Sequence, residues 1–145
     1  MRPNALSKKE AAILAAVGRG LIPAGGPHFS LGARDIEDKW LPRADYVISR
    51  MSLFNRLGIK CWLHAIDYGW PLLMRKRLGS LRRMPDEELE ALLHRVESYG
   101  LIGVASLVMA KVLIFPAVYG VPAASRAIGY RTKFPVPEEF EGIKD

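Results

Sequence analysis

Residues 101–121 read LIGVASLVMAKVLIFPAVYGV and are almost wholly apolar, with Lys111 as the only charged residue. Twenty apolar residues in a helix are enough to cross a bilayer. A lysine near the centre opposes insertion by roughly 2.5–3.5 kcal/mol, however, and Pro116 interrupts the run. A helix that is apolar on every side otherwise lies in a protein core or in an interface.

We therefore expect this helix to be shared between the core of the chain and a partner, because 145 residues leave little else to cover every side of it. Two alternatives stay open: the helix lies on a membrane surface, or it spans a membrane. The residues expected at the partner interface are Leu101, Val104, Val108, Lys111, Val112, Phe115 and Tyr119.

The segment that opens the chain also carries a clear helix signal. Ser7 and Glu10 have the spacing of a capping box, in which each side chain bonds the backbone amide of the other residue. Apolar residues then recur at helical spacing, and a loop rich in glycine and proline ends the pattern. This apolar stripe consists of Ala11, Ile13, Leu14, Val17 and Leu21.

Three further helices are expected between these two segments, and a short one after them. They cover 34–49, where Pro42 should kink or split the helix, then 52–74, and a helix that begins at Pro85. The last helix covers 123–127. The third-helix residues Leu53, Leu57, Cys61, His64 and Tyr68 share one face, and the fourth helix should bury Leu89, Leu92, Leu93 and Val96.

The fold class that follows is all-α, because no run of residues alternates as a strand would. We expect residues 1–145 to form a single helical domain, a compact bundle of five or six helices. The ends, 1–6 and 131–145, should be extended, and the C-terminal tail from residue 131, which is rich in Pro and Glu, should be irregular.

The composition excludes several classes of protein. A hydrophobic fraction of 50% and a charged fraction of 25% exclude a disordered or low-complexity chain. A net charge of +6 suits nucleic acid, anionic lipid or an acidic protein. The single cysteine, Cys61, excludes an internal disulfide, a cysteine-rich zinc site and Cys-x-x-Cys-His haem attachment, and we expect its thiol to be buried and inert.

Five basic residues cluster around the Gly79 break, and two interpretations of them stay open. They form a solvated face, or they dock onto an acidic partner or lipid headgroups. Nucleic acid is not expected, because no stacking platform or helix-turn-helix pattern accompanies them. The residues of this basic cluster are Arg75, Lys76, Arg77, Arg82 and Arg83.

No set of residues has the spacing of a catalytic or metal site. His28, His64 and His94 stand apart, without the paired spacing of a zinc motif. The acidic residues of 86–90 lie at a helix start, where the helix dipole favours negative charge. We therefore expect no catalytic residue, no bound cofactor and no metal in this chain, and thus no enzyme activity of its own.

The N-terminal residues lack a secretory pattern. A secretory signal peptide needs a basic region, a run of apolar residues and a small-residue cleavage site. A twin-arginine signal needs two adjacent arginines, and Arg2 stands alone. We expect a cytoplasmic protein, with association with a membrane as a further expectation.

Two motifs lie near the ends of the chain. The first is Leu6-Ser7-x-x-Glu10, followed by Leu14 and by Leu21-Ile22-Pro23 with glycines behind it. The second is Tyr119-x-x-Pro122 followed by Arg126-Ala127-Ile128-Gly129-Tyr130, in which Ile128, Gly129 and Tyr130 form a structural motif. Together with the proline-to-tyrosine spacing of the ending, these motifs resemble the gluconate 2-dehydrogenase subunit 3 family, and the resemblance covers about 6–130.

The resemblance implies a small helical accessory subunit. Such a subunit binds and stabilises a large FAD-dependent dehydrogenase of the glucose–methanol–choline type that oxidises an alcohol, sugar or sterol. FAD and the substrate site would belong to the large subunit, and a cytochrome or a membrane surface is a further candidate partner. The alternative hypothesis is an independent helical protein, anchored on a membrane surface by residues 101–121 and the basic cluster.

Overall fold

The computed structural model describes residues 5–26, 30–76 and 78–129. These residues form an all-α fold without strands, as the sequence predicts. The helices are α1 (Lys8–Leu21), α2 (Glu37–Arg50), α3 (Leu53–Arg75), α4 (Asp86–Glu97), α5 (Gly100–Tyr119) and α6 (Pro122–Ala127), with a short 3₁₀ turn, η1 (Leu81–Arg83), before α4. The expected extended ends and irregular tail lie almost wholly outside the described residues.

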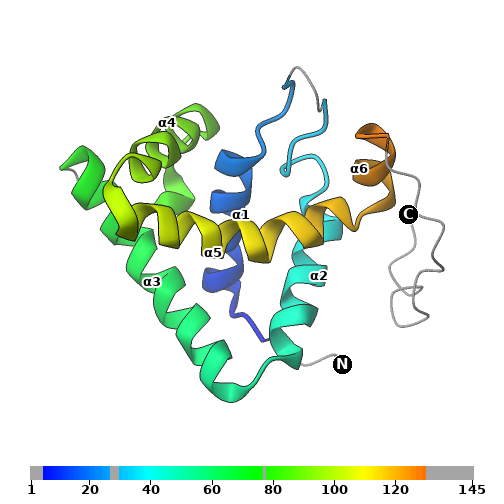
Figure 1. The fold of residues 1–145 in the computed structure, drawn as a ribbon, viewed down its shortest axis with the longest axis horizontal. Coiled ribbons are helices and arrows are strands. Elements are labelled where there is room, and N and C mark those ends of the chain that lie inside the picture. Colours follow the sequence, from blue (N-terminus) through cyan, green and yellow to red (C-terminus); the bar gives the residue numbers. More distant parts are fainter. Residues whose placement is uncertain (1–4, 27–29, 77, 130–145) are drawn as a thin grey trace.

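Helix α1 lies at the centre of the molecule and packs against α2, α3, α4, α5 and η1. Figure 1 shows α5 crossing in front of α1, while α2 and α3 diverge from a tight connection at one end. The capping box is present: the Ser7 amide donates to Glu10 Oε2 at 2.7 Å, and the Glu10 amide donates to Ser7 Oγ at 3.2 Å. These bonds fix where the central helix begins.

One cluster of buried hydrophobic residues runs through all six helices. Its largest fully buried side chain is Trp40 of α2, whose indole Nε1 donates to the Ala33 carbonyl at 2.8 Å and so remains hydrogen-bonded in the core. The predicted stripe of α4 is buried in full: Leu89, Leu92, Leu93 and Val96 all face the core. Pro85 lies at the N-cap of α4, one position before the helix.

The middle helices differ from the expectations in two details. Helix α2 is continuous through Pro42, so of the two expected effects of this proline the split does not occur; the carbonyl left without an amide partner belongs to Asp38 in the exposed first turn. On α3 the predicted residues do share one face, but this face points to solvent, so Cys61 is exposed rather than buried as expected. The core receives the opposite face of α3, which is apolar except for the buried Asp67 and consists of Ile59, Leu63, Ile66, Asp67, Trp70 and Pro71.

The turn between α4 and α5 depends on a close backbone approach at Gly103. A Cβ atom there would lie 1.9 Å from the Val96 carbonyl oxygen, so a side chain requires the two helices to move apart. Gly58 on α3 is the natural comparison, because a Cβ atom there would meet nothing within 4 Å.

We predict that Gly103→Ala lowers the free energy of unfolding by about 2 kcal/mol, since overpacking typically costs 1–3 kcal/mol. Gly58→Ala should instead raise the free energy of unfolding by about 0.5–1 kcal/mol, because alanine has a higher helix propensity than glycine at an exposed position. Denaturant unfolding followed by circular dichroism measures both. A Gly103→Ala variant as stable as the parent chain would contradict the close packing described.

Candidate functional site

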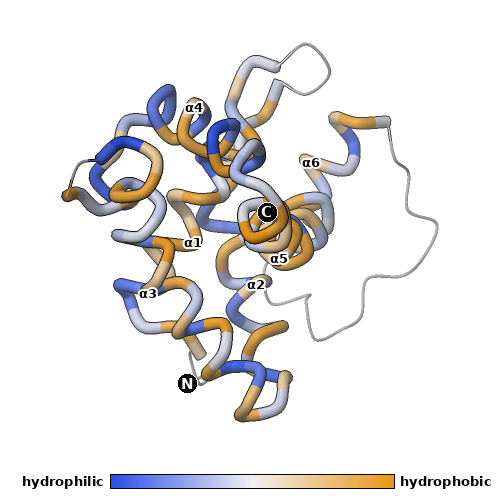
Figure 2. Tube along the Cα trace, turned by 60° about the vertical axis from the view of Figure 1, so that its left-hand side comes forward, coloured by the Kyte–Doolittle hydropathy of each residue, from blue (hydrophilic) through white to orange (hydrophobic). Residues whose placement is uncertain are grey.

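An exposed apolar surface runs along the outward side of α5. Its apolar side chains are exposed along most of the helix, up to 85% for Leu101 and 66% for Val112. Figure 2 shows that hydrophobic colouring runs along α5. We call this surface the outer face of α5: Leu101, Ile102, Val104, Ala105, Val108, Met109 and Val112.

The other predicted interface residues lie nearer to the body of the protein. Lys111, Phe115 and Tyr119 are half-buried, and the rings of Phe115 and Tyr119 pack edge to face with centroids 5.7 Å apart. Lys111 Nζ lies 3.7 Å from Glu97 Oε1, so the only charge on α5 has an acidic partner. The outer face of α5 therefore presents hydrocarbon without an unpaired charge.

Helix α5 is long and apolar enough to cross a membrane, with a mean hydropathy of 2.3 over its best window and a third of that window buried inside the molecule. One such helix is weak evidence for a membrane span, because core helices of soluble proteins share these properties. Helix α5 packs on α1, α2 and α4, and the Trp62 indole of α3 donates to Ser106 Oγ at 2.8 Å.

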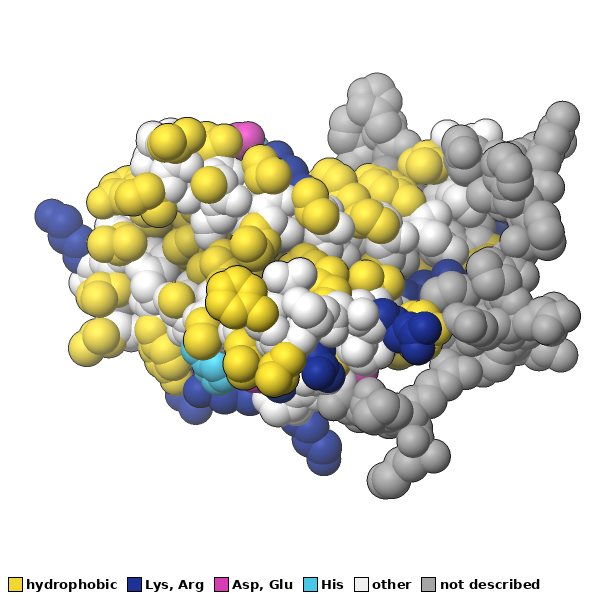
Figure 3. Space-filling model, turned by 60° about the horizontal axis from the view of Figure 1, so that its bottom comes forward, with side chains coloured by type: hydrophobic (Ala, Val, Ile, Leu, Met, Phe, Trp, Pro, Cys, Tyr) yellow, Lys and Arg dark blue, Asp and Glu magenta, His cyan; other side chains and the backbone are white. Residues whose placement is uncertain are grey.

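A second exposed apolar surface follows α3. Phe54 is 85% exposed and Leu53 is 64% exposed, and other large side chains continue the surface toward the end of the helix. We call this surface the outer face of α3: Leu53, Phe54, Leu57, Tyr68, Leu72 and Leu73. In Figure 3, hydrophobic side chains gather across this side of the molecule, and Lys and Arg side chains lie mainly toward its edges.

The five predicted residues of the basic cluster do not form one free patch. Arg82 Nε lies 3.4 Å from Oδ2 of the fully buried Asp67, whose other oxygen accepts a hydrogen bond from Ser80 Oγ at 2.6 Å. Arg75 forms an ion pair with Glu88 of α4. Lys76 and Arg83 are exposed to solvent, and Arg77 lies outside the described residues. Arg75 and Arg82 therefore hold α3, η1 and α4 together.

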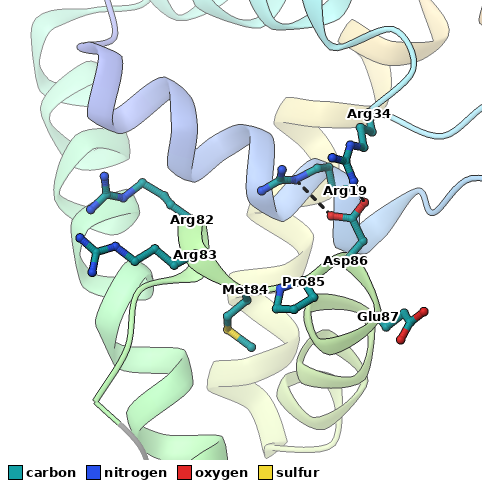
Figure 4. Close-up of a pocket in the computed structure, with 8 residues that line it drawn as sticks. All are labelled: Arg19, Arg34, Arg82, Arg83, Met84, Pro85, Asp86 and Glu87. Atoms are coloured by element: carbon teal, nitrogen blue, oxygen red, sulfur yellow. Dashed lines mark hydrogen bonds and ion pairs between the residues drawn. The ribbon is translucent and has the colours of Figure 1, made fainter.

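Four arginines surround a hollow of about 570 Å³ near the start of α4, shown in Figure 4. They do not converge on a common point. Arg19 Nε lies 3.6 Å from Asp86 Oδ1, and an Arg34 guanidinium nitrogen lies 3.0 Å from Asp86 Oδ2. Arg82 and Arg83 point to the other side, away from Asp86. Asp86 thus already pairs with two of the four cations, and the hollow is not a preformed anion site.

Glu10 brings together α1 and α3 by a small polar cluster. Its carboxylate lies 3.2 Å from Lys60 Nζ and 3.4 Å from His64 Nε2. Burial alone raises the pKa of Glu10, but the hydrogen bonds from Ser7 and Lys60, together with the Lys60 charge, outweigh burial and bring the pKa below its ordinary value. The cluster explains the position of His64 without a catalytic role.

The described residues contain no group of three or more His, Cys, Asp or Glu that could hold a metal ion. His94 lies exposed on α4, and His28 lies outside the described residues. At the end of α6, Ile128 is 45% exposed and Gly129 has a φ of 77°, the left-handed geometry expected for a glycine after a helix. Tyr130, the last residue of that motif, lies outside the described residues.

No protein-family model, curated protein or solved structure matches the chain. Its function is therefore inferred from the chemistry of its own surface and from the motifs near its two ends.

We predict that Arg82→Glu lowers the free energy of unfolding by about 2 kcal/mol or more, because it places a second negative charge beside the buried Asp67. The matched control is Arg83→Glu. Arg83 is exposed, so this variant should stay within about 0.5 kcal/mol of the parent chain. Urea unfolding measures both variants, and equal stabilities would show that Arg82 has no internal role.

We predict that Glu10→Gln lowers the free energy of unfolding at pH 7 by about 1 kcal/mol, since glutamine keeps the cap but loses the charged partners. The folded-state pKa of Glu10 is lowered, so the ionised carboxylate stabilises the fold above the ordinary pKa of 4.5. This contribution is lost as the pH falls through the folded-state pKa.

The difference between parent and Glu10→Gln should therefore shrink as the pH is lowered below 4.5. Denaturant titrations across the acidic range measure it, with Glu87→Gln on the exposed first turn of α4 as the control. A difference that is independent of pH would contradict the ionic role of Glu10.

Proposed function

We propose that this chain is a non-catalytic accessory subunit that binds and stabilises an FAD-dependent dehydrogenase of the glucose–methanol–choline type. The observation that carries the proposal is the outer face of α5, a continuous apolar surface without an unpaired charge. The motifs near the two ends of the chain, which resemble the gluconate 2-dehydrogenase subunit 3 family, supply the identity of the partner.

The chemistry of α5 suits a protein partner. The fully buried centre of a protein interface is depleted of charged residues and rich in hydrocarbon. Helix α5 is about 30 Å long from its 20 residues, which is long enough to form such a centre. Soluble monomers rarely expose a large contiguous apolar patch, so the outer face of α5 indicates a surface that another molecule covers.

In this proposal the flavin and the substrate site belong to the large subunit. The small subunit covers hydrocarbon on its partner and is itself held in a defined arrangement by that contact. The substrate class follows from the resemblance alone: an alcohol, a sugar or a sterol. A cytochrome is a further candidate partner of the complex, and the proposed location is the cytoplasm, with membrane association as an additional expectation.

The test is purification of the tagged chain from its native cells, followed by identification of the proteins that are recovered with it. The expected result is a stable complex that shows FAD absorbance. Val108→Asp and Val112→Asp should weaken the complex about 30-fold or more, because each buries a charge in an apolar interface, at a cost of about 2 kcal/mol or more. Both valines are exposed, so both variants should fold normally.

The matched control is Leu57→Asp on the outer face of α3, which is 52% exposed and lies on the other apolar surface. It should leave the complex intact. Recovery of the chain without any flavin protein would contradict the proposal. Recovery with membranes alone, abolished by Val108→Asp, would favour the alternative of an independent membrane-surface protein.

A further inference from the structure

We infer that the outer face of α3 is a docking surface for an anionic phospholipid membrane. This deepens the membrane association that the proposed function includes, because it assigns that association to a different helix from the one offered to the flavin subunit. The two apolar surfaces differ in one respect that decides their occupants. The outer face of α5 carries no unpaired charge, whereas cations frame the outer face of α3.

The charged residues of the stretch that contains α3 are almost all positive; from the neighbouring helices, Glu10 pairs with Lys60 and Glu88 pairs with Arg75. Between residues 46 and 83 the only acidic residue is Asp67, which is fully buried and bonded to Ser80 and Arg82. The exposed surface of α3 therefore has no carboxylate among its described residues. The same stretch of sequence carries Arg50, Arg56, Lys60, Arg75, Lys76, Arg77, Arg82 and Arg83.

The exposed cations lie at both ends of α3 and beside its middle. Arg50 ends the preceding helix, Lys76 follows the last residue of α3, and both are exposed to solvent. Lys9 of α1 lies with its Nζ 5.7 Å from the centroid of the Tyr68 ring, about two-thirds along α3. The hydrocarbon of α3 therefore has a positive charge near each end and one along its side.

This pattern matches an interfacial helix. Helices that lie in the plane of a membrane place Leu and Phe in the acyl boundary and Lys and Arg among the headgroups. Basic residues near a bilayer attract its anionic lipids. Helix α3 has 23 residues and is about 34 Å long, so the most exposed side chains at its start, Leu53 and Phe54, can enter a bilayer while Lys76 contacts headgroups at its other end.

A second copy of the chain fits this surface less well. A two-fold contact places the same patch of each copy against the other, so the cations that frame the two faces would lie close together. An anionic bilayer has the opposite charge and requires no matching shape. A protein with a complementary acidic surface is the remaining occupant, and the experiment below separates it from lipid.

The test is flotation of the purified full chain with lipid vesicles on a density gradient, in which aggregated protein sediments and lipid-bound protein rises. We expect flotation with phosphatidylcholine vesicles that contain phosphatidylglycerol, and at least tenfold less with phosphatidylcholine alone. Added salt should weaken the binding, since headgroup attraction is screened. Phe54→Ser, Leu57→Asp and the pair Arg50→Glu with Lys76→Glu should each reduce flotation at least tenfold.

The control is Val108→Asp on the outer face of α5, which should float like the parent chain. Circular dichroism confirms that each variant is folded. Equal binding to neutral and anionic vesicles, or no binding to either, would overturn the inference and leave an acidic protein as the occupant. Loss of flotation in Val108→Asp but not in Leu57→Asp would assign the membrane to α5 instead. Co-purification tests the flavin partner and flotation tests the membrane contact, so either proposal can be contradicted without the other.

Discussion

A helix that is apolar on every side has to be covered on every side, and this constraint governs the molecule. Helix α5 crosses in front of the central α1 and buries one side against α1, α2 and α4. The remaining helices are too few to enclose it, and only a third of its most apolar window is buried. Lys111 is paired with Glu97, so the only charge on α5 would enter a partner interface together with a carboxylate of opposite sign.

The two exposed apolar surfaces differ in their chemistry and therefore in the occupants proposed for them. Without unpaired charges, the outer face of α5 resembles the centre of a protein interface, whereas the outer face of α3 has a basic frame and suits anionic headgroups. Two of the arginines that resemble a docking patch in the sequence form ion pairs within the fold instead. Arg75 and Arg82 join α3 and η1 to their neighbours through Glu88 and Asp67.

Local signals in the sequence predict much of this fold. The capping box at Ser7, the stripe of α4 and the helical run of α5 depend on residues close together in the chain, and all three are present. The orientation of α3 could not be predicted this way, because both of its faces carry apolar residues and its packing against α1, η1 and α4 decides between them. The pairing of Arg82 with Asp67 joins residues 15 apart, and no local pattern indicates it.

The central proposal is that a flavin dehydrogenase covers the outer face of α5. Met109 is a suitable probe of this contact, because it lies on that face and is 43% exposed. Hydroxyl-radical footprinting of the free chain and of the complex compares its oxidation directly. The account predicts that Met109 is oxidised in the free chain and protected in the complex, while Tyr68 on α3 stays reactive in the absence of lipid. Equal oxidation of Met109 in both samples would contradict it.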